Sequence, residues 1–365
     1  MKFYNRKLVL EDGTEYLGYG FGSNTEKICE IVFNTSMVGY QEMVSDSSCI
    51  NKMVVMTYPL IGNYGITDED FESKKIHIGG LIVKQYCEEP SNFRYTNTLS
   101  ELLEENEVPG IYGIDTRKLA KNLRDTGNKK AIITDINTTK ENALEKLKKY
   151  EIPKDAVSKV SCKKKWYSRT TNAKVNIIAI DCGIKSSIVK NLNKRGGNVI
   201  VVPYNASSED ILSLKPDGIF ISNGPGNPEE IPETINTIKE LKGKKPIFGI
   251  GLGHQIISLA YGAKIEKLKS SHSGINHPVR NLENNKIEIT SQNHSYAVKE
   301  KSLEKTELKP THINILDNTI EGVECKKDKI FSVQYQPEGA PGPQDSEYLF
   351  DKFFKLVEGG KKKNA

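Results

Sequence analysis

Three segments in the second half of the chain combine glycine, proline and polar side chains in arrangements that could carry chemistry. They are residues 222–228, 249–255 and 334–338. The middle segment has the G-x-x-x-G spacing of a nucleophile elbow, in which glycines allow a tight strand-to-helix turn and the central side chain stands at its apex. The apex here is Gly251, which has no side chain to present. The spacing therefore predicts the backbone of a covalent-catalysis site without its nucleophile.

The elements that must position these segments alternate between apolar strands and helices. Apolar runs occupy residues 175–180, 199–202, 218–221 and 246–250, with helical spacing at 184–192 and 209–214. Continuous apolar runs joined by helices are typical of a parallel, doubly wound sheet that is covered on both faces. Ligands of such sheets bind beyond the carboxyl ends of the strands. We therefore expect the three segments to converge at one edge of the sheet.

The first half of the chain has a different pattern. Short strands are expected near residues 8–10 and 30–33, and helices at 98–105 and 116–125, which indicates a mixed α/β domain. Residues 153–173 are rich in Lys, Ser and Thr, as linkers often are. The expected organisation is a mixed domain at 1–152, a linker at 153–173, a doubly wound and mainly parallel domain at 174–360, and a basic tail at 361–365.

Composition supports a globular protein with more than one core. The chain has 365 residues, of which 37% are hydrophobic and 27% charged, so disorder is excluded and two domains are expected. No apolar run reaches the length of a signal peptide or a membrane span, so we expect a cytoplasmic protein without membrane contact. The six cysteines form no C-x-x-C pair, which argues against a zinc site and a disulfide framework. A net charge of +5, much of it in two lysine runs, gives no reason to expect a nucleic-acid partner.

The three segments together resemble the class I glutamine amidotransferases, in which the elbow carries a cysteine and the last segment reads His-Pro-Glu. Motifs elsewhere narrow the resemblance to the small subunit of carbamoyl phosphate synthetase. These motifs lie at residues 34–42, 57–63, 91–93, 113–117, 292–294 and 341–343. The resemblance spans nearly the whole chain. It implies an amidotransferase fold for the second domain and docking on a large subunit for the first.

That family hydrolyses glutamine and passes the ammonia through a tunnel to the large subunit, which makes carbamoyl phosphate for arginine and pyrimidine synthesis. The resemblance places ATP and Mg²⁺ on the large subunit, so neither a cofactor nor a metal is expected in this chain. L-Glutamine is the ligand that the second domain is expected to bind if its pocket is preserved. The glutamine contacts implied by matching positions are Ser48, Gly224, Gly226, Leu252, Gln255, Asn293, Ser295 and Tyr296.

Two of the three catalytic positions carry residues that cannot perform the family's reaction. Gly251 stands where the resemblance implies the thiol, and Gln336 stands where it implies the imidazole, while Glu338 keeps the carboxylate. A covalent mechanism needs a nucleophile and a base, and a glutamine amide does not titrate near neutral pH. We therefore expect negligible glutaminase activity and a complex that depends on free ammonia.

Other interpretations remain open. The chain could bind glutamine and report its level without cleaving it, or hydrolyse it by another route, for example with Cys182 replacing the missing thiol. Further departures from the family at Asn227, Ile275 and Gln344 favour natural drift over an engineered change, although both stay possible explanations.

The histidines and glycines near these motifs also have ordinary interpretations. His254 and His294 are interpreted as structural residues, and the spacing of His272 and His277 is weak grounds for a metal site. Residues 249–253 could be mistaken for a dinucleotide fingerprint. That fingerprint requires G-x-G-x-x-G at the first turn of the sheet, and here the sixth position is His254.

Overall fold

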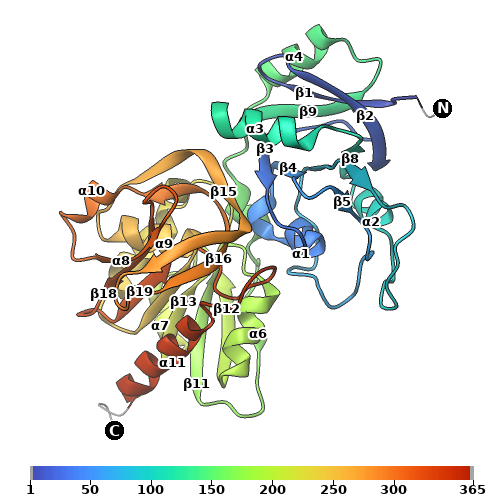
Figure 1. The fold of residues 1–365 in the computed structure, drawn as a ribbon. Helices are drawn as coiled ribbons and strands as arrows, with labels where there is room; N and C mark the ends of the chain where they lie inside the picture. The colour runs from blue at the N-terminus through green and yellow to red at the C-terminus, as the bar shows by residue number, and fades with distance from the viewer. Residues whose placement is uncertain (1–2, 362–365) are drawn as a thin grey trace. The chain divides into compact units, whose positions relative to one another are not determined.

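The computed structural model describes residues 3–361, which divide into two compact units (Figure 1). The first unit consists of Met1–Pro153 together with Lys269–Gly274. The second unit consists of Lys154–Leu268 and Ile275–Ala365. The change of unit at residue 153 falls next to the end of the mixed domain that the sequence indicates at residue 152, but the return of six residues to the first unit was not expected from the sequence.

The first unit is built around a closed barrel in which strands follow the order β1-β2-β8-β6-β4-β3-β9. The pairs formed by β3 with β4, β4 with β6 and β6 with β8 are parallel, and the others are antiparallel. A two-stranded sheet of β5 and β7 lies outside the barrel order. The strands are β1 (Arg6–Leu10), β2 (Glu15–Gly22), β3 (Lys27–Asn34), β4 (Lys52–Met56), β5 (Leu60–Ile61), β6 (Gly80–Ile82), β7 (Gln85–Tyr86), β8 (Pro109–Tyr112) and β9 (Lys129–Asp135).

Local capping explains the two helices that the sequence predicts in this unit. Thr98 and Glu101 form a reciprocal capping box at the start of the first helix. The second helix starts after Asp115, whose side chain accepts a hydrogen bond from Lys118 N, and ends before Gly127 at φ 95°. The helices of the unit are α1 (Tyr40–Ser45), η1 (Ser47–Cys49), α2 (Leu99–Glu105), α3 (Thr116–Thr126) and α4 (Lys140–Lys149).

The second unit contains a ten-stranded sheet with the order β10-β12-β11-β13-β14-β19-β18-β16-β15-β17. Strands β12, β11, β13, β14 and β19 are parallel, and the other five strands pair antiparallel. The expectation of a mainly parallel sheet therefore holds only for this central part. The antiparallel strands escaped the apolar-run pattern because β15 contains many exposed or half-exposed polar residues, and β16 buries polar residues such as Glu288, Gln292 and His294 in place of apolar ones. The strands are β10 (Trp166–Ser168), β11 (Val175–Asp181), β12 (Gly197–Pro203), β13 (Gly218–Ile221), β14 (Ile247–Ile250), β15 (Ile265–Asn281), β16 (Ile287–Val298), β17 (Lys309–Asn314), β18 (Ile320–Cys325) and β19 (Ile330–Val333).

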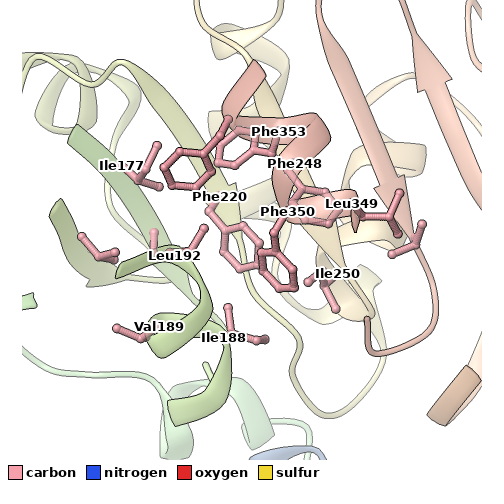
Figure 2. Packing of buried hydrophobic residues seen from close by; sticks show 14 of the residues in the cluster. Ile177, Ile188, Val189, Leu192, Phe220, Phe248, Ile250, Leu349, Phe350 and Phe353 are labelled. Atoms are coloured by element: carbon pink, nitrogen blue, oxygen red, sulfur yellow. The ribbon is translucent and has the colours of Figure 1, made fainter. Parts of the chain in front are cut away.

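Helices cover both faces of the parallel strands, as the sequence predicts. On one face, Phe220 and Phe248 pack with side chains of α6 and α11 (Figure 2). On the other face, Ile219 and Ile247 pack with α7, α8 and α9. None of the helices within residues 3–361 is long and apolar enough to cross a membrane. The helices of this unit are α5 (Ala156–Val160), α6 (Ser186–Lys194), α7 (Ser208–Ser213), η2 (Pro228–Glu230), α8 (Pro232–Leu241), α9 (Leu252–Ala260), α10 (Glu300–Leu303) and α11 (Tyr348–Lys361).

The segment expected to be a linker, residues 153–173, has regular structure instead. It contains α5 and the edge strand β10, which pairs antiparallel with β12. Cys162 N also donates a hydrogen bond of 2.8 Å to Asp181 Oδ2, which ties the segment to the sheet. Polar and basic residues are tolerated at a sheet edge, so a composition rich in Lys, Ser and Thr does not distinguish an edge strand from a linker. Of the basic tail expected at 361–365, Lys361 ends α11 and residues 362–365 lie outside the described part of the chain.

Candidate active site

The three polar segments meet at one edge of the parallel sheet. They follow β13, β14 and β19, which are adjacent and parallel. Gly251 N donates a hydrogen bond of 2.9 Å to Val333 O, and Gly253 N donates one of 3.1 Å to Ser222 O. These bonds tie the middle segment to both neighbours. The convergence predicted from the sequence is confirmed.

Gly251 has the backbone of an elbow. It joins β14 to α9 with φ 59° and ψ −112°, a conformation that residues with a Cβ adopt only at a cost. A Cβ placed on Gly251 would lie 3.5 Å from Asn223 Cβ and 3.8 Å from Gln334 O, which are ordinary van der Waals distances. Helix α9 starts directly after it, so the partial positive charge of the helix N-terminus lies beside the apex. The elbow therefore has room for a Cβ but lacks the reacting atom.

A buried ion pair between Lys185 and Glu338 lies in the same site. Lys185 Nζ is 2.8 Å from Glu338 Oε1, and the two side chains are 1% and 0% exposed. The same ammonium group donates to Gln336 Oε1 at 3.3 Å and to the carbonyl of Ala340. Buried charges need such partners because desolvation is costly. The carboxylate that would orient a catalytic base is therefore engaged by a cation.

Lys185 was missed by the sequence analysis. It directly precedes α6, in the turn that follows β11, a strand of the same parallel sheet. The available signal was its position, since turns after parallel strands share one edge of the sheet. A lysine in that turn, four residues after Asp181, is therefore a candidate for the site.

Gln336 is held in place by backbone contacts. Its N–H donates a hydrogen bond of 2.8 Å to Ser291 O, and the two residues form an isolated antiparallel bridge. Its side-chain oxygen accepts from Lys185, so the amide serves as a hydrogen-bond acceptor for a cation. An amide cannot take and return a proton near neutral pH. In this arrangement Gln336 can stabilise charge but cannot act as a general base.

The glycines after β13 show why the backbone passes so close to the elbow. A Cβ on Gly224 would lie 2.2 Å from Cys182 O and 2.8 Å from Leu252 Cδ2, so only glycine fits there. Gly226 has φ 85°, and a Cβ there would meet its nearest neighbours at 3.6 Å, an ordinary van der Waals distance. The first glycine is needed for close packing and the second for its left-handed conformation.

The remaining predicted contacts lie on α9, β16 and, in the first unit, η1. Leu252 and Gln255 are buried in the first turn of α9, and Gln255 Nε2 donates to Tyr296 O at 3.0 Å. Tyr296 lies on β16 together with Asn293 and Ser295. The structure thus brings Gln255 into contact with β16.

Ser48 lies in the first unit. It is buried in η1, where its N–H donates a hydrogen bond of 2.9 Å to Asp46 Oδ1. This bond is a local turn contact, typical of the Asp-Ser-Ser sequence at residues 46–48. The assignment of Ser48 as a glutamine contact stays a prediction from the family resemblance.

Comparison with known proteins identifies the family to which this chain belongs. Residues 178–356 match the family described as glutamine amidotransferase class-I, and residues 8–133 match the carbamoyl-phosphate synthase small chain, CPSase domain. The chain is 49% identical to the carbamoyl phosphate synthase small chain of Fusobacterium nucleatum, over 98% of this chain and 100% of that one. The chain belongs to the carbamoyl phosphate synthase small-chain family.

Two further relatives have the same extent of similarity. The pyrimidine-specific small chain of Bacillus subtilis is 49% identical over 97% of this chain and 96% of its own length. The small chain of Oceanobacillus iheyensis is 48% identical over 99% of this chain and 98% of its own. The small-chain family is thus matched in both halves, in agreement with the motifs of the first and second domains. A partnership with the large chain of the synthase follows from membership of the small-chain family.

Cys182 is poorly suited to replace the missing thiol in this small-chain fold. Its side chain is fully buried in the apolar cluster between the sheet and α9, and its N–H donates a hydrogen bond of 2.9 Å to Ser222 Oγ. Burial raises the pKa of the Cys182 thiol, and the nearby Asp181 raises it further. Because the thiolate is the nucleophile, a thiol kept neutral in an apolar core has little reactivity.

The two histidines near the site have structural contacts. His254 is fully buried, and its Nδ1 is 2.9 Å from Ser332 Oγ. Burial, with a smaller contribution from His312, lowers the pKa of His254 to about 3, so its ring is neutral at physiological pH. His294 contacts Tyr296 O through Nδ1 at 2.8 Å and a glutamine side chain through Nε2 at 3.0 Å.

One cluster of side chains in the second unit could offer ligand atoms to a metal, but its carboxylates already have other partners. The side chains of Glu307, Cys325 and Asp328 have potential ligand atoms within 4.8 Å of one another. However, Lys327 pairs with Glu307 at 3.1 Å, and the hydroxyl of Tyr261 donates to Asp328 at 2.5 Å. These contacts engage both carboxylates without a metal, so we assign none to this cluster. His272 and His277 belong to different units, and no shared site is assigned to them.

Proposed function

We propose that this chain is a carbamoyl phosphate synthase small chain that hydrolyses glutamine negligibly, so that its complex with the large chain uses free ammonia. In this proposal the first unit docks on the large chain, where ATP and Mg²⁺ bind and carbamoyl phosphate is made for arginine and pyrimidine synthesis. The family name of the relatives supports the partnership, and the chemistry of the elbow supports the loss of hydrolysis.

The observation that carries the proposal is Gly251 at the apex of the elbow. Hydrolysis of an amide by a covalent route requires an atom that attacks the carbonyl carbon and a base that returns a proton to the departing ammonia. Gly251 has no such atom, and Gln336 cannot exchange a proton at neutral pH. Loss of the nucleophile or the base lowers the rate by on the order of 10⁴ to 10⁶, and the two losses do not add.

Lys185 does not restore the reaction. Its ammonium group is paired with Glu338 and donates two further hydrogen bonds, so no lone pair is available for attack or for proton abstraction. The site retains a helix N-terminus and closely packed glycines that could hold a ligand, but among its described residues neither Lys185 nor Cys182 provides an exposed nucleophile.

The decisive experiment uses the chain in complex with its large chain. Carbamoyl phosphate formation is measured with bicarbonate and ATP, first with glutamine as nitrogen donor and then with ammonium salt. We expect synthesis from ammonium and a rate with glutamine at least about 10³-fold lower. Glutamate release from the complex is measured in parallel. Equal synthesis from the two donors, with stoichiometric glutamate, would show that the proposal is wrong.

A second function is favoured by the packing around the elbow. The glycine frame at Gly224 and the fixed amide of Gln255 are the features of a formed binding site, and neither depends on the missing thiol. On this alternative the chain binds glutamine without cleaving it and reports its level to the large chain. Calorimetric titration of the complex with glutamine separates the two functions, because the absence of binding heat at millimolar glutamine excludes the regulatory one.

A further inference from the structure

Two buried glutamine side chains are joined behind the elbow. Gln255 Nε2 donates a hydrogen bond of 2.9 Å to Gln334 Oε1 and a second of 3.0 Å to the carbonyl oxygen of Tyr296. Gln255 is 3% exposed and Gln334 is 1% exposed. Gln334 directly follows β19, in the same segment as Gln336, and no motif in the sequence assigns it a role.

These contacts fix which way the Gln255 amide faces. The carbonyl of Tyr296 can only accept a hydrogen bond, so Gln255 must present its NH₂ group there. Both hydrogens of that group are then used, and Gln334 must in turn present its oxygen. The result is that Oε1 of Gln255 is left as the acceptor end of the amide.

The pairing of the two amides leaves one buried hydrogen-bond donor unpaired. Gln334 Nε2 is buried and has no hydrogen-bond partner among the described residues. Native structures rarely leave a buried donor unpaired, and such exceptions call for an explanation. Reversing the Gln334 amide would place its NH₂ group against that of Gln255, so the orientation of Gln255 is maintained at the expense of Gln334.

Gln334 is also connected to the elbow through its backbone. Its N–H donates a hydrogen bond of 2.8 Å to Glu321 O on β18. Its carbonyl oxygen would lie 3.8 Å from a Cβ on Gly251. One residue, held by the neighbouring strand, therefore lies beside the apex of the elbow and accepts a hydrogen bond from the amide of Gln255.

We propose that Gln334 is a positioning residue that turns Oε1 of Gln255 toward an N–H donor of bound glutamine, its amino or amide group. The recognition of glutamine by Gln255 rests on the second function proposed above, in which the chain binds glutamine, whereas the orientation of the Gln255 amide does not. In this proposal Gln334 touches neither the nucleophile position at the elbow nor the amide carbon of glutamine. It acts through Gln255 alone and therefore affects substrate binding more than the chemical step.

The first test follows the side-chain NH₂ resonances of Gln255 in the ¹⁵N-labelled full chain, assigned by their loss in Gln255→Glu. Gln334→Met removes the acceptor at similar size, and Gln334→Glu keeps an acceptor oxygen. We expect Gln334→Met to shift these resonances and speed their hydrogen exchange at least about tenfold, while Gln334→Glu leaves them protected. Gln41→Met is the control, because Gln41 is a buried, hydrogen-bonded glutamine of the first unit. Unchanged Gln255 resonances in Gln334→Met would overturn the positioning role.

The second test measures recognition in a chain carrying Gly251→Cys and Gln336→His, in complex with the large chain. Adding Gln334→Met should raise KM for glutamine about tenfold and change kcat less than about threefold, and Gln334→Glu should recover most of the loss. An equal fall in kcat with unchanged KM would overturn the binding role. Failure of both the unmodified and the restored chain to bind or turn over glutamine would overturn it as well. Efficient hydrolysis by the unmodified chain would instead contradict the proposed function and leave the resonance test standing.

Discussion

The reacting positions of the elbow site, Gly251 and Gln336, have lost the groups that catalysis needs. The residues that pack around them, such as Gly224 and Lys185, here called the frame, still make the contacts that hold the site together. At the elbow, Gly251 provides a conformation with no reacting atom, and Gln336 provides a hydrogen-bond acceptor in place of a base. In the frame, Gly224 packs against Cys182 O so closely that no Cβ fits, and Lys185 neutralises a buried carboxylate. The reacting groups can be lost without cost to the fold because few contacts depend on them. The frame residues cannot, because the fold of the second unit depends on them.

This difference shows that geometry and reactivity are encoded by separate residues. A glycine adopts a positive φ with less backbone strain than a residue that carries a Cβ. The elbow with glycine at its apex is therefore more stable than the same elbow with a nucleophilic residue there. Activity and stability should therefore change in opposite directions when the apex is altered. Changes to the frame residues should lower stability, and at Gly224, a predicted glutamine contact, they should also weaken the binding of glutamine.

The largest expected effect comes from restoring both reacting groups, with Gly251→Cys and Gln336→His together. Glutamine-dependent synthesis should rise on the order of 10⁴-fold, equivalent to about 5 kcal/mol of barrier. The free energy of unfolding should fall by about 1 kcal/mol, since φ 59° is strained for a residue with a Cβ. Either single change should recover little activity. If the double variant stays inactive with the same glutamine affinity as the unmodified chain, the frame no longer has the catalytic geometry.

The next effect concerns the buried ion pair. Lys185→Met leaves the carboxylate of Glu338 buried without its cation, which should lower the free energy of unfolding by about 3 to 5 kcal/mol. Urea unfolding is followed by the fluorescence of Trp166, the only tryptophan, which lies on β10 and reports on the second unit. The matched control is Lys185→Met combined with Glu338→Gln. This double variant should recover much of the loss, and no recovery would mean that Lys185 contributes through packing.

Much of this frame was predictable from the sequence, and the reasons are local. The apolar runs at β11 and β13 could be assigned because both faces of these strands are buried, and the elbow because its glycines have fixed spacing. The barrel order and the antiparallel extension of the sheet were not predictable, since they depend on pairings between distant strands. Residues 153–173 were misjudged because an edge strand tolerates the composition of a linker. No sequence pattern marks Lys185 or Gln334, because each matters through a partner that is distant in the sequence: Glu338 after β19 for Lys185, and Gln255 on α9 for Gln334.

A smaller effect is expected from the glycines of the frame. Gly224→Ala places a Cβ 2.2 Å from the carbonyl oxygen of Cys182, and the required backbone shift should cost about 2 to 3 kcal/mol of unfolding free energy. Gly226→Ala is the control, because its Cβ meets nothing within 3.5 Å and only the left-handed φ of 85° opposes it, at about 1 kcal/mol. The same Trp166 fluorescence measures both variants. Equal losses would show that conformation, and not the close approach, sets the requirement for glycine after β13.

The smallest effect is a dependence on pH that belongs to the packing behind the elbow. Burial lowers the pKa of His254 to about 3, whereas an exposed histidine in the unfolded chain titrates near 6.5. Between these values the unfolded chain binds a proton that the folded chain does not, so stability falls as pH decreases, by at most about 1.4 kcal/mol per pH unit. In His254→Gln, unfolding free energies between pH 6 and pH 4 should have a shallower slope by that amount, whatever the variant costs at pH 7. His312, whose pKa burial lowers to about 4, makes a similar contribution, so His312→Gln should also make the slope shallower. Identical slopes in the unmodified chain and His254→Gln would mean that His254 gains its proton without unfolding, and that the region behind the elbow opens to water more readily than its burial indicates.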